Sequence, residues 1–415
     1  MAERAAAATV IPEGEATHLG IVLGLAMGPA VGLGLGRFAY ALLLPSMRLE
    51  LGWSYAQAGA MNTANAAGYL IGALAAAATA ARFGNKRGFL LGLLLTAASL
   101  LATGLTSDYA VLAVLRAIAG AAGALSLITG GALAASDGGG GGRGRPALAL
   151  GVYFGGAGFG MAVSAFAVPA LVAEVGWRTG WFVLGALGMA ATVAALPALA
   201  RAPEVAAHAA HRGPTFGMHA ARGLHAVVAS YVLFGAGYIA YTTFIVAYLR
   251  SNLSFGADEV TLFWGCVGLA ATGAGLAWGP LLARLSGGRG VAAANAVVVA
   301  GAILPVLIAT RPAVYASAVL FGGSFLIVPT SVTAFVRKAA APQAWTAAIA
   351  VLTVGFALGQ CIGPWLSGVV SDTSYGVAGG LLLSGVILAG AALIALLQRE
   401  PHVIARSETT RQSPS

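Results

Sequence analysis

Two arginines lie inside long apolar stretches of the sequence, where a charged side chain is costly and needs a physical reason. Arg37 ends the glycine-rich run GPAVGLGLGR, and Arg116 lies within LAVLRAIAGAAG. A guanidinium group keeps its charge and binds a carboxylate through two parallel hydrogen bonds. The sequence leaves two interpretations of Arg37 open. Its side chain extends to the membrane surface, or it binds an anionic or strongly dipolar substrate.

The composition explains why these stretches are expected to lie in lipid. Of the 415 residues, 59% are hydrophobic and only 8% are charged, whereas soluble domains carry about 25% charged residues. A helix of about 20 mostly apolar residues crosses a bilayer, and the sequence contains twelve such stretches. The predicted fold class is therefore an all-α integral membrane protein with twelve transmembrane helices. The predicted spans are 19–44, 55–81, 89–106, 110–135, 147–172, 179–200, 226–249, 259–283, 291–309, 313–336, 346–370 and 376–397.

The distribution of lysine and arginine predicts how the chain is oriented. Sixteen of the 22 basic residues lie in the tails and the even-numbered connections, and two lie within spans. The odd-numbered connections hold Arg48, Arg178, Arg250 and Arg311. Because positive charge concentrates on the cytoplasmic side, the sequence predicts a multi-pass protein of the plasma (inner) membrane with both termini cytoplasmic. The net charge of +9 predicts attraction to anionic membrane lipid, and no nucleic-acid partner is expected.

The sequence divides near its middle into two predicted halves. A polar connection separates two groups of six spans, and similar basic loops, ARFGNKRG and ARLSGGRG, follow the second and the eighth span. Such a repeat is typical of transporters with two parallel six-helix halves. The predicted divisions are a cytoplasmic N-terminal tail (1–18), an N-terminal half (19–200), a cytoplasmic linker (201–224), a C-terminal half (225–397) and a cytoplasmic C-terminal tail (398–415).

With these features the sequence resembles the major facilitator superfamily over nearly its whole length. The two basic loops are similar to the loop motif of that family, LAVLRAIAGAAG to its fourth-helix motif, and GWRTGWF to its entry into helix six. The stretches GLGRFAYALLLPSM, GWSYAQAG and GYLIGAL resemble more narrowly the YbfB/YjiJ-like subgroup. The resemblance implies two pseudo-symmetric six-helix halves and a monomeric protein.

The resemblance also implies residues that gate the transport path or support its helices. Arg82 and Arg284 lie in the two loop motifs, but Ala81 and Ala283 occupy the position where the family has an acid. This departure weakens the charge relay that is attributed to the motif. The resemblance gives Arg116 a gating or structural role, and an interfacial anchor bonded to neighbouring carbonyls is the alternative.

Glycine and proline recur at corresponding places in the two halves. Gly155 and Gly156 lie in the fifth span, and Gly363 and Pro364 lie in the eleventh. Interrupted segments in corresponding positions point to the binding site of a transporter, so we expect these four residues to act in gating or helix packing. A second pattern places Gly20, Gly24, Gly28, Gly32 and Gly36 along the first span. Static close packing and a sliding contact between helices both fit this pattern.

Polar and aromatic residues inside the spans predict the lining of a central cavity. Asn62, Asn65 and Tyr69 share one helix face because of their three- and four-residue spacing. The candidates come from spans one, two, five, seven, eight and eleven, which line the cavity in the resembled fold. The predicted substrate-binding residues are Arg37, Tyr40, Asn62, Asn65, Tyr69, Tyr153, Tyr238, Tyr241, Thr242, Trp264 and Gln360.

Several other functions lack the residues that they need. All thirteen aspartates and glutamates fall outside the centres of the spans, which disfavours export of cations and favours an anion or a neutral solute. No HExxH, GxSxG or paired intramembrane carboxylates mark an enzyme, so no enzymatic activity is predicted. The histidines lack cysteine partners at ligand spacing, and neither a metal site nor a cofactor is predicted.

The predicted function is secondary active transport of a small organic anion or polar metabolite by alternating access, with Arg37 as the charge partner of the substrate. The coupling partner, a proton or a counter-anion, is left open. Proton-coupled efflux of amphipathic drugs or toxic metabolites is the alternative function. A non-transporting membrane receptor or sensor is the second alternative.

Overall fold

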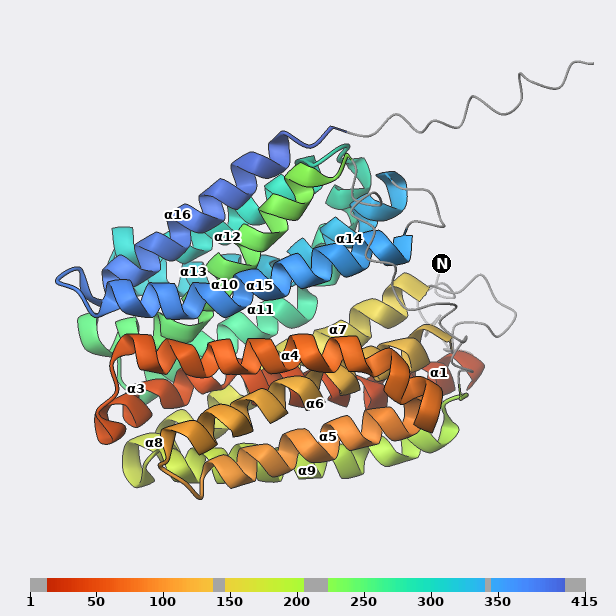
Figure 1. Cartoon of the computed structure of the whole chain (residues 1–415), viewed down its shortest axis with the longest axis horizontal. Helices are drawn as coiled ribbons and strands as arrows, with labels where there is room; N and C mark the ends of the chain where they lie inside the picture. Colours follow the sequence, from red (N-terminus) through yellow and green to blue (C-terminus); the bar gives the residue numbers. More distant parts are fainter. Residues whose placement is uncertain (1–12, 137–145, 205–222, 340–344, 400–415) are drawn as a thin grey trace, which may run out of the picture.

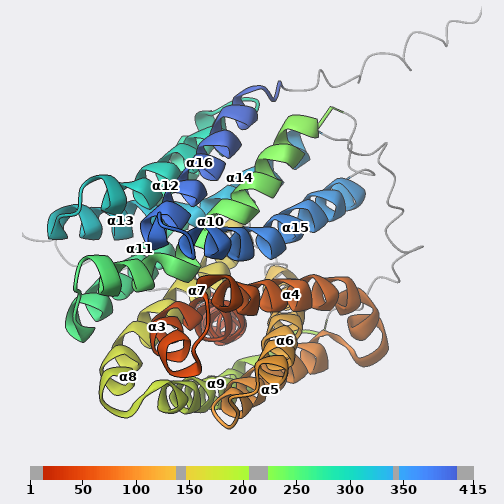
Figure 2. The same ribbon diagram turned by 60° about the vertical axis from the view of Figure 1, so that its left-hand side comes forward.

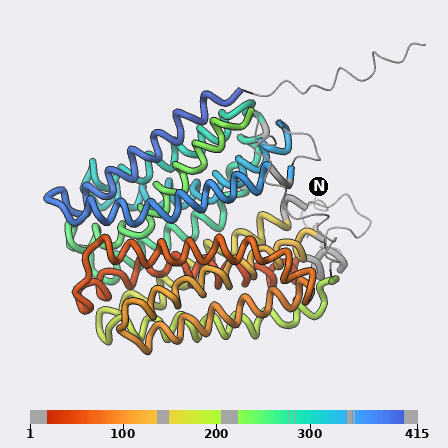
Figure 3. Tube along the Cα trace, in the orientation of Figure 1, coloured from red at the N-terminus to blue at the C-terminus, as the bar shows by residue number. Residues whose placement is uncertain are grey.

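The computed structural model describes residues 13–136, 146–204, 223–339 and 345–399, and every regular element in these ranges is a helix. Figure 1 and the trace in Figure 3 show two bundles, one from the first two ranges and one from the last two. The greater part of the predicted linker, 205–222, lies outside the described residues, as do residues 1–12 and 400–415 of the predicted tails. Residues 13–18 of the predicted N-terminal tail already belong to the first helix.

The first bundle contains the predicted spans one to six. Its elements are α1 (Glu13–Leu25), α2 (Met27–Pro29), η1 (Ala30–Phe38), α3 (Tyr40–Leu51), α4 (Tyr55–Phe83), α5 (Asn85–Thr103), α6 (Tyr109–Ser136), α7 (Pro146–Ala167), α8 (Pro169–Val175) and α9 (Trp177–Arg201). The first predicted span is thus four consecutive elements that continue to Leu51, and the fifth is divided before Pro169.

The second bundle contains the predicted spans seven to twelve. Its elements are α10 (His225–Asn252), α11 (Ala257–Arg284), α12 (Arg289–Leu307), α13 (Arg311–Phe325), α14 (Ile327–Ala339), α15 (Trp345–Ser371) and α16 (Gly376–Leu396). Eleven helical segments in the described part of the chain are long and apolar enough to cross a membrane. The 28-residue helix α11 occupies the place of the remaining predicted span. The architecture of twelve membrane helices is confirmed.

The first span contains an unusual winding. Residues 30–38 form a π-helix, and the turn closes where the Ala39 amide donates to the Gly34 carbonyl over 3.1 Å. The π-helix is rare overall, and where it does occur it is often part of a functional site. Nothing in the glycine spacing of the sequence predicts this winding. Its consequence is local: it sets the direction of Arg37, the next-to-last residue of the segment.

The two bundles meet along two pairs of helices, α4 with α15 and α7 with α11, and α3 also contacts α10. Figure 2 shows α4 and α15 facing each other across the boundary. One end of the molecule carries α1 and the last turn of α16, and we call it the terminal end. The opposite end carries Gly52 and Asp372, and we call it the far end. The bundles are in close contact toward the far end, where the Thr63 hydroxyl in α4 donates to the Cys361 carbonyl in α15 over 2.6 Å.

A carboxylate at the far end closes this boundary. Asp372 follows α15 in the second bundle, and it accepts hydrogen bonds from the amides of Tyr55 and Ala56, over 2.7 and 2.9 Å. These amides begin α4 in the first bundle, where the positive end of the helix dipole favours a negative charge. One side chain therefore ties the two bundles together at the far end.

The bundles separate toward the terminal end. Along this part of α4, Gly72 and Ala76 are buried but Ile71 and Leu74 are exposed. In α15, the residues from 349 to 356 are partly exposed, apart from the buried Leu352. Figure 1 shows α4 and α15 diverging in this direction. The arrangement is closed at the far end and open at the terminal end.

Glycine allows the first span to pack closely on its neighbours. A Cβ atom placed on Gly34 would lie 2.6 Å from the Cα of Gly160 in α7, and one on Gly32 would lie 2.9 Å from the Cα of Gly123 in α6. Such close backbone approach is the usual source of helix association in lipid, where the hydrophobic drive is small. The contacts agree with the packing interpretation of the glycine pattern.

We expect Gly34→Ala to destabilise the protein by about 1–3 kcal/mol, because its methyl group would meet the α7 backbone. Gly20→Ala is the matched control, since a Cβ atom at Gly20 has no neighbour within 4 Å, and it should be neutral or slightly stabilising. Thermal unfolding of the two purified variants in detergent measures the difference. Equal midpoints would contradict the proposed close packing of η1.

Candidate substrate site between the two bundles

Arg37 lies at the boundary between the bundles and is 2% exposed. Its Nη2 donates to Oε1 of Gln360 in α15 over 2.8 Å, and Nε2 of Gln360 donates to the Tyr238 hydroxyl in α10 over 2.6 Å. The guanidinium also lies over the ring of Tyr69 in α4, 5.3 Å from its centroid. The interpretation in which Arg37 extends to the membrane surface is therefore wrong, because its partners hold it between the bundles.

Arg116 is the second buried arginine and is also 2% exposed. Its Nη1 donates to the Gly36 carbonyl over 2.6 Å and its Nη2 to Oδ1 of Asn62 over 3.1 Å. Its guanidinium lies near the rings of Tyr40 and Trp181, 4.9 and 5.5 Å from their centroids. Because Gly36 immediately precedes Arg37, Arg116 holds the backbone from which the Arg37 side chain projects.

Asn62 extends this network into the second bundle. Its Nδ2 donates to Oγ1 of Thr243 in α10 over 2.6 Å, while its Oδ1 accepts from Arg116. Asn65, one turn later in α4, donates to the Arg116 carbonyl over 3.0 Å. Two polar connections therefore cross the boundary side by side: Arg37 with Gln360, and Arg116 through Asn62 with Thr243.

Among the described residues, no buried carboxylate balances the charge of this site. Among the residues whose burial is described, Arg37 and Arg116 are the buried charged side chains, and none of the buried residues is an aspartate or glutamate. The Nε atom of each arginine has no hydrogen-bond partner among the described residues. Burial of a charge is costly unless it is paired and fully hydrogen-bonded. The site therefore has a positive potential and unused donors, and both features favour an anion.

Comparison with known proteins agrees with the fold and places the chain in a family. Residues 29–396 match the family model described as "Uncharacterised MFS-type transporter YbfB". The chain belongs to this major facilitator family. It is therefore a multi-pass membrane transporter, and its family is one of transporters rather than of enzymes. No curated protein matches this transporter by sequence.

Solved structures share the fold of the transporter at low sequence identity. A point mutant of the nucleoside transporter NupG aligns with a TM-score of 0.72 at 15% identity, covering 91% of this chain and 98% of that one. A bacterial homologue of the human lysosomal transporter Spinster, in an inward-facing and unoccupied conformation, aligns with a TM-score of 0.68 at 15% identity over 92% and 96%. The human organic anion transporter MFSD10 aligns with a TM-score of 0.60 at 14% identity over 93% and 100%.

Four of the predicted substrate-binding residues make no described hydrogen bond to the network around Arg37. The Tyr153 hydroxyl donates to the Leu127 carbonyl, and the Tyr241 hydroxyl pairs with Ser317, both within their own bundles. Thr242 donates to the Ile239 carbonyl of its own helix. Trp264 is buried with an unpartnered Nε1. None of these described bonds connects the four residues to Arg37, and their binding role stays a prediction.

The structure adds residues that are not among the predicted substrate-binding residues. Thr243 is the acceptor for Asn62, and Thr63 donates across the boundary to Cys361. Phe356 of α15 stacks on Tyr238, with the ring centroids 5.7 Å apart. The sequence signal for Thr243 was the polar run GYIAYTTF, but neighbouring threonines point about 100° apart on a helix. Only the packing of α10 selects one of them.

The glycines of the fifth and eleventh spans divide between two kinds of contact. A Cβ atom at Gly155 would lie 3.2 Å from the Thr272 carbonyl of α11, across the boundary. Gly156 faces Ala26, and Gly363 faces Ala236, each within its own bundle. The carbonyl of Pro364 lies against Gly59 of α4. Gly155 and Pro364 are therefore at the boundary that must change if the bundles reorient, whereas the other two support packing.

The two loop motifs lie at the terminal end, with Arg82 and Arg284 exposed. Arg82 lies over the ring of Phe83, 5.5 Å from its centroid. An acid does reach the first motif, although Ala81 occupies the expected position. Glu204, which follows α9, accepts from the amides of Asn85 and Lys86 over 2.7 and 3.4 Å. The sequence analysis missed this contact because its partners are more than 100 residues apart.

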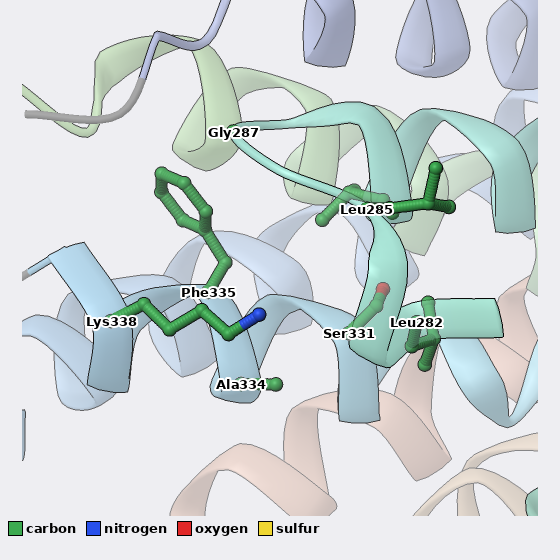
Figure 4. A pocket seen from close by; sticks show the side chains of 9 residues that line it. Leu282, Leu285, Gly287, Ser331, Ala334, Phe335 and Lys338 are labelled. Atoms are coloured by element: carbon green, nitrogen blue, oxygen red, sulfur yellow. The ribbon is translucent and has the colours of Figure 1, made fainter. Parts of the chain in front are cut away.

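A small pocket beside the second loop motif is separate from the arginine site. It has a volume of about 30 Å³ and lies between the α11–α12 connection and α14, where Ser331, Phe335 and Lys338 line it. Figure 4 shows the Lys338 amine directed along this pocket. The space fits about one water molecule, which is too small for a metabolite. This pocket does not compete with the boundary as the substrate site.

We expect Thr243→Val to destabilise the transporter by about 1–3 kcal/mol, because it leaves the buried Nδ2 of Asn62 without an acceptor. Thr242→Val is the matched control, since the described hydrogen bond of the adjacent hydroxyl stays within its own helix. It should stay within about 0.5 kcal/mol of wild type. The free energy of unfolding, measured by denaturant titration in micelles, distinguishes the two. A larger loss of stability in the Thr242 variant would show that Thr242, and not Thr243, bonds across the boundary.

Proposed function

We propose that this protein is a secondary active transporter of a small organic anion or polar metabolite, with Arg37 as the charge partner of the substrate. The observation that carries the proposal is the burial of Arg37 at the boundary between the bundles, with no buried carboxylate among the described side chains. A permanent carboxylate partner would neutralise the site. An anionic substrate supplies the missing charge only while it is bound.

The geometry of Arg37 suits reversible binding of a carboxylate. Its described hydrogen bond goes to a neutral amide, Gln360, and its Nε is unpartnered. A carboxylate can take Nε and Nη2 together in the bidentate geometry that arginine favours, and Gln360 then retains Tyr238 as a partner. MFSD10, which shares the fold, is described as an organic anion transporter, and this description agrees with the proposal.

Transport is proposed to proceed by alternating access. The terminal end carries most of the basic connections, so we place it and both termini on the cytoplasmic side of the inner membrane. The arrangement described above is then closed outward and open inward. Reorientation requires the Asp372 contacts and the two polar connections at the arginine site to break, and the substrate to replace part of what is lost.

The remaining partners are proposed from the family and from the net positive charge of the sequence. The transporter works as a monomer in contact with anionic lipid, and a proton or a counter-anion provides the coupling. No metal or cofactor is part of the proposal. Efflux of amphipathic drugs would suit a site in which Arg37 faces away from the boundary, and the contacts of Arg37 with Gln360 and Tyr69 disfavour that function.

We expect Arg37→Gln to weaken binding of organic anions by at least about tenfold, because each of the two charge-assisted hydrogen bonds to a bidentate carboxylate contributes roughly 1.5–3 kcal/mol. Counterflow in proteoliposomes with mono- and dicarboxylates, and with their neutral amides, measures the effect. Arg178→Gln is the control, since Arg178 forms an exposed ion pair with Glu50 in the same bundle. The proposal is rejected if amides and carboxylates are bound equally by wild type, or if a folded Arg37→Gln protein transports anions normally.

We expect Asp372→Asn to increase the population that is open at the far end, several-fold and up to about tenfold, because it removes a charge that contributes roughly 1 kcal/mol at a helix N-terminus. Spin labels at Leu49→Cys and Tyr375→Cys, in a protein with Cys266 and Cys361 replaced by serine, report the distance between the bundles. Both positions are exposed at the far end.

Asp108→Asn is the matched control for the far-end contact. Asp108 also lies at a helix N-terminus, but it accepts from Val111 of its own bundle. Its replacement should leave the distance distribution unchanged. If the two variants alter the distribution equally, Asp372 has no special part in closing the far end.

A further inference from the structure

We propose that the substrate carries an aromatic ring next to its carboxylate, so that this protein is a transporter of aromatic carboxylates. The inference rests on the proposed function and deepens it. Its basis is a set of nearly parallel aromatic rings on one face of the second bundle that ends at the partner of Arg37.

The ring set comes from two helices. Tyr231, Phe234 and Tyr238 lie three and four residues apart in α10 and therefore share one helix face. The ring of Phe356 in α15 is nearly parallel to all three, within 10°, with centroids 4.5, 5.8 and 5.7 Å away. We call these four residues the aromatic column. Rings that stack across two neighbouring helices form an aromatic cluster with which another planar ring can stack.

The aromatic column is connected directly to the cationic site. The Tyr238 hydroxyl accepts from Gln360, which in turn accepts from Arg37. On the opposite side of the boundary, the Tyr69 ring lies against the Arg37 guanidinium. An anion bound to Arg37 would therefore lie near aromatic rings of both bundles, because Tyr69 contacts Arg37 itself and Tyr238 contacts its partner Gln360.

Burial distinguishes the rings available to a ligand from those that only pack. Phe234 and Tyr238 are buried, whereas Phe356 and Tyr69 are partly exposed. The two partly exposed rings lie on α15 and α4, at the level where these helices begin to separate toward the terminal end. A ligand ring that enters from that end reaches Phe356 and Tyr69 while its carboxylate reaches Arg37.

The chemistry favours an aromatic ring over an alkyl group. Aromatic pairs gain attraction from the charge distribution of the rings in addition to the area that they bury. A saturated ring of the same size is more apolar and would bind equally or better at a surface that offered burial alone. The preference between the two therefore reports on the aromatic column.

Four compounds that differ in only two properties test the inference. Benzoate is aromatic and anionic, cyclohexanecarboxylate is anionic only, benzamide is aromatic only, and cyclohexanecarboxamide is neither. Their apparent affinities for the purified full-length transporter are measured by thermal stabilisation against concentration. We expect benzoate to bind roughly 2- to 13-fold more tightly than cyclohexanecarboxylate, the range that ring contacts produce. Both carboxylates should bind more tightly than their amides.

The outcomes separate this inference from the proposed function. If the two carboxylates bind equally, or neither binds while other carboxylates are bound, the aromatic inference fails and the anion transporter stands. If the amides bind as tightly as the carboxylates, and no other carboxylate is preferred to its amide, the proposed function fails as well. Preference for benzoate over the other three compounds supports both.

Two variants assign the preference to named rings. Phe356→Leu and Tyr69→Leu keep apolar volume and remove a ring, so each should lower the ratio of benzoate to cyclohexanecarboxylate affinity toward one. The affinity for cyclohexanecarboxylate itself should change little. Phe159→Leu is the control, because Phe159 in α7 is 49% exposed and belongs to none of the contacts described here. An unchanged ratio in both test variants, or an equal fall in the control, overturns the inference.

Discussion

Two buried guanidinium groups that have no carboxylate partner in the described part of the chain are the constraint on which the site depends. A charge that cannot reach water must be surrounded by acceptors, and here every described acceptor is neutral: the Gly36 carbonyl, Asn62 and Gln360. These acceptors come from η1, α4 and α15, so the charges determine how three helices meet. The π winding of η1 and the hydrogen bond that Arg116 donates to it act together, because both direct Arg37 toward the boundary.

Neutral partners also decide how easily the boundary can open. Separating a buried ion pair leaves two unpaired charges, which is very costly. Separating Arg37 from Gln360, or Asn62 from Thr243, leaves one charge or none, and a bound anion reduces even that cost. The far end uses a different principle. Asp372 is already exposed to solvent in this arrangement, so its charge stays hydrated when its contact with α4 breaks.

Glycine sets the distance at which these interactions operate. Gly34 lies against the backbone of Gly160, and Gly59 lies against the Pro364 carbonyl. A side chain at Gly59 would hold α4 and α15 apart, whereas one at Gly34 would push η1, which carries Arg37, away from α7. The many glycines of this chain therefore do more than relax the backbone: close approach at Gly59 brings polar groups of α4 and α15 within bonding distance, and close approach at Gly34 fixes the position of η1.

The sequence by itself determined the membrane class, the twelve spans, the two halves and the family, because apolar length, basic-loop asymmetry and local motifs are properties of consecutive residues. It also selected Arg37, Arg116, Asn62, Tyr69, Tyr238 and Gln360, since polar groups in lipid are conspicuous. It named Thr242, whereas Thr243 is the residue that bonds to Asn62, and it could not foresee the π winding of η1 or pair Asp372 with Tyr55. Those features depend on helix rotation and on contacts between residues as many as 317 positions apart, which only the packing of the two bundles decides.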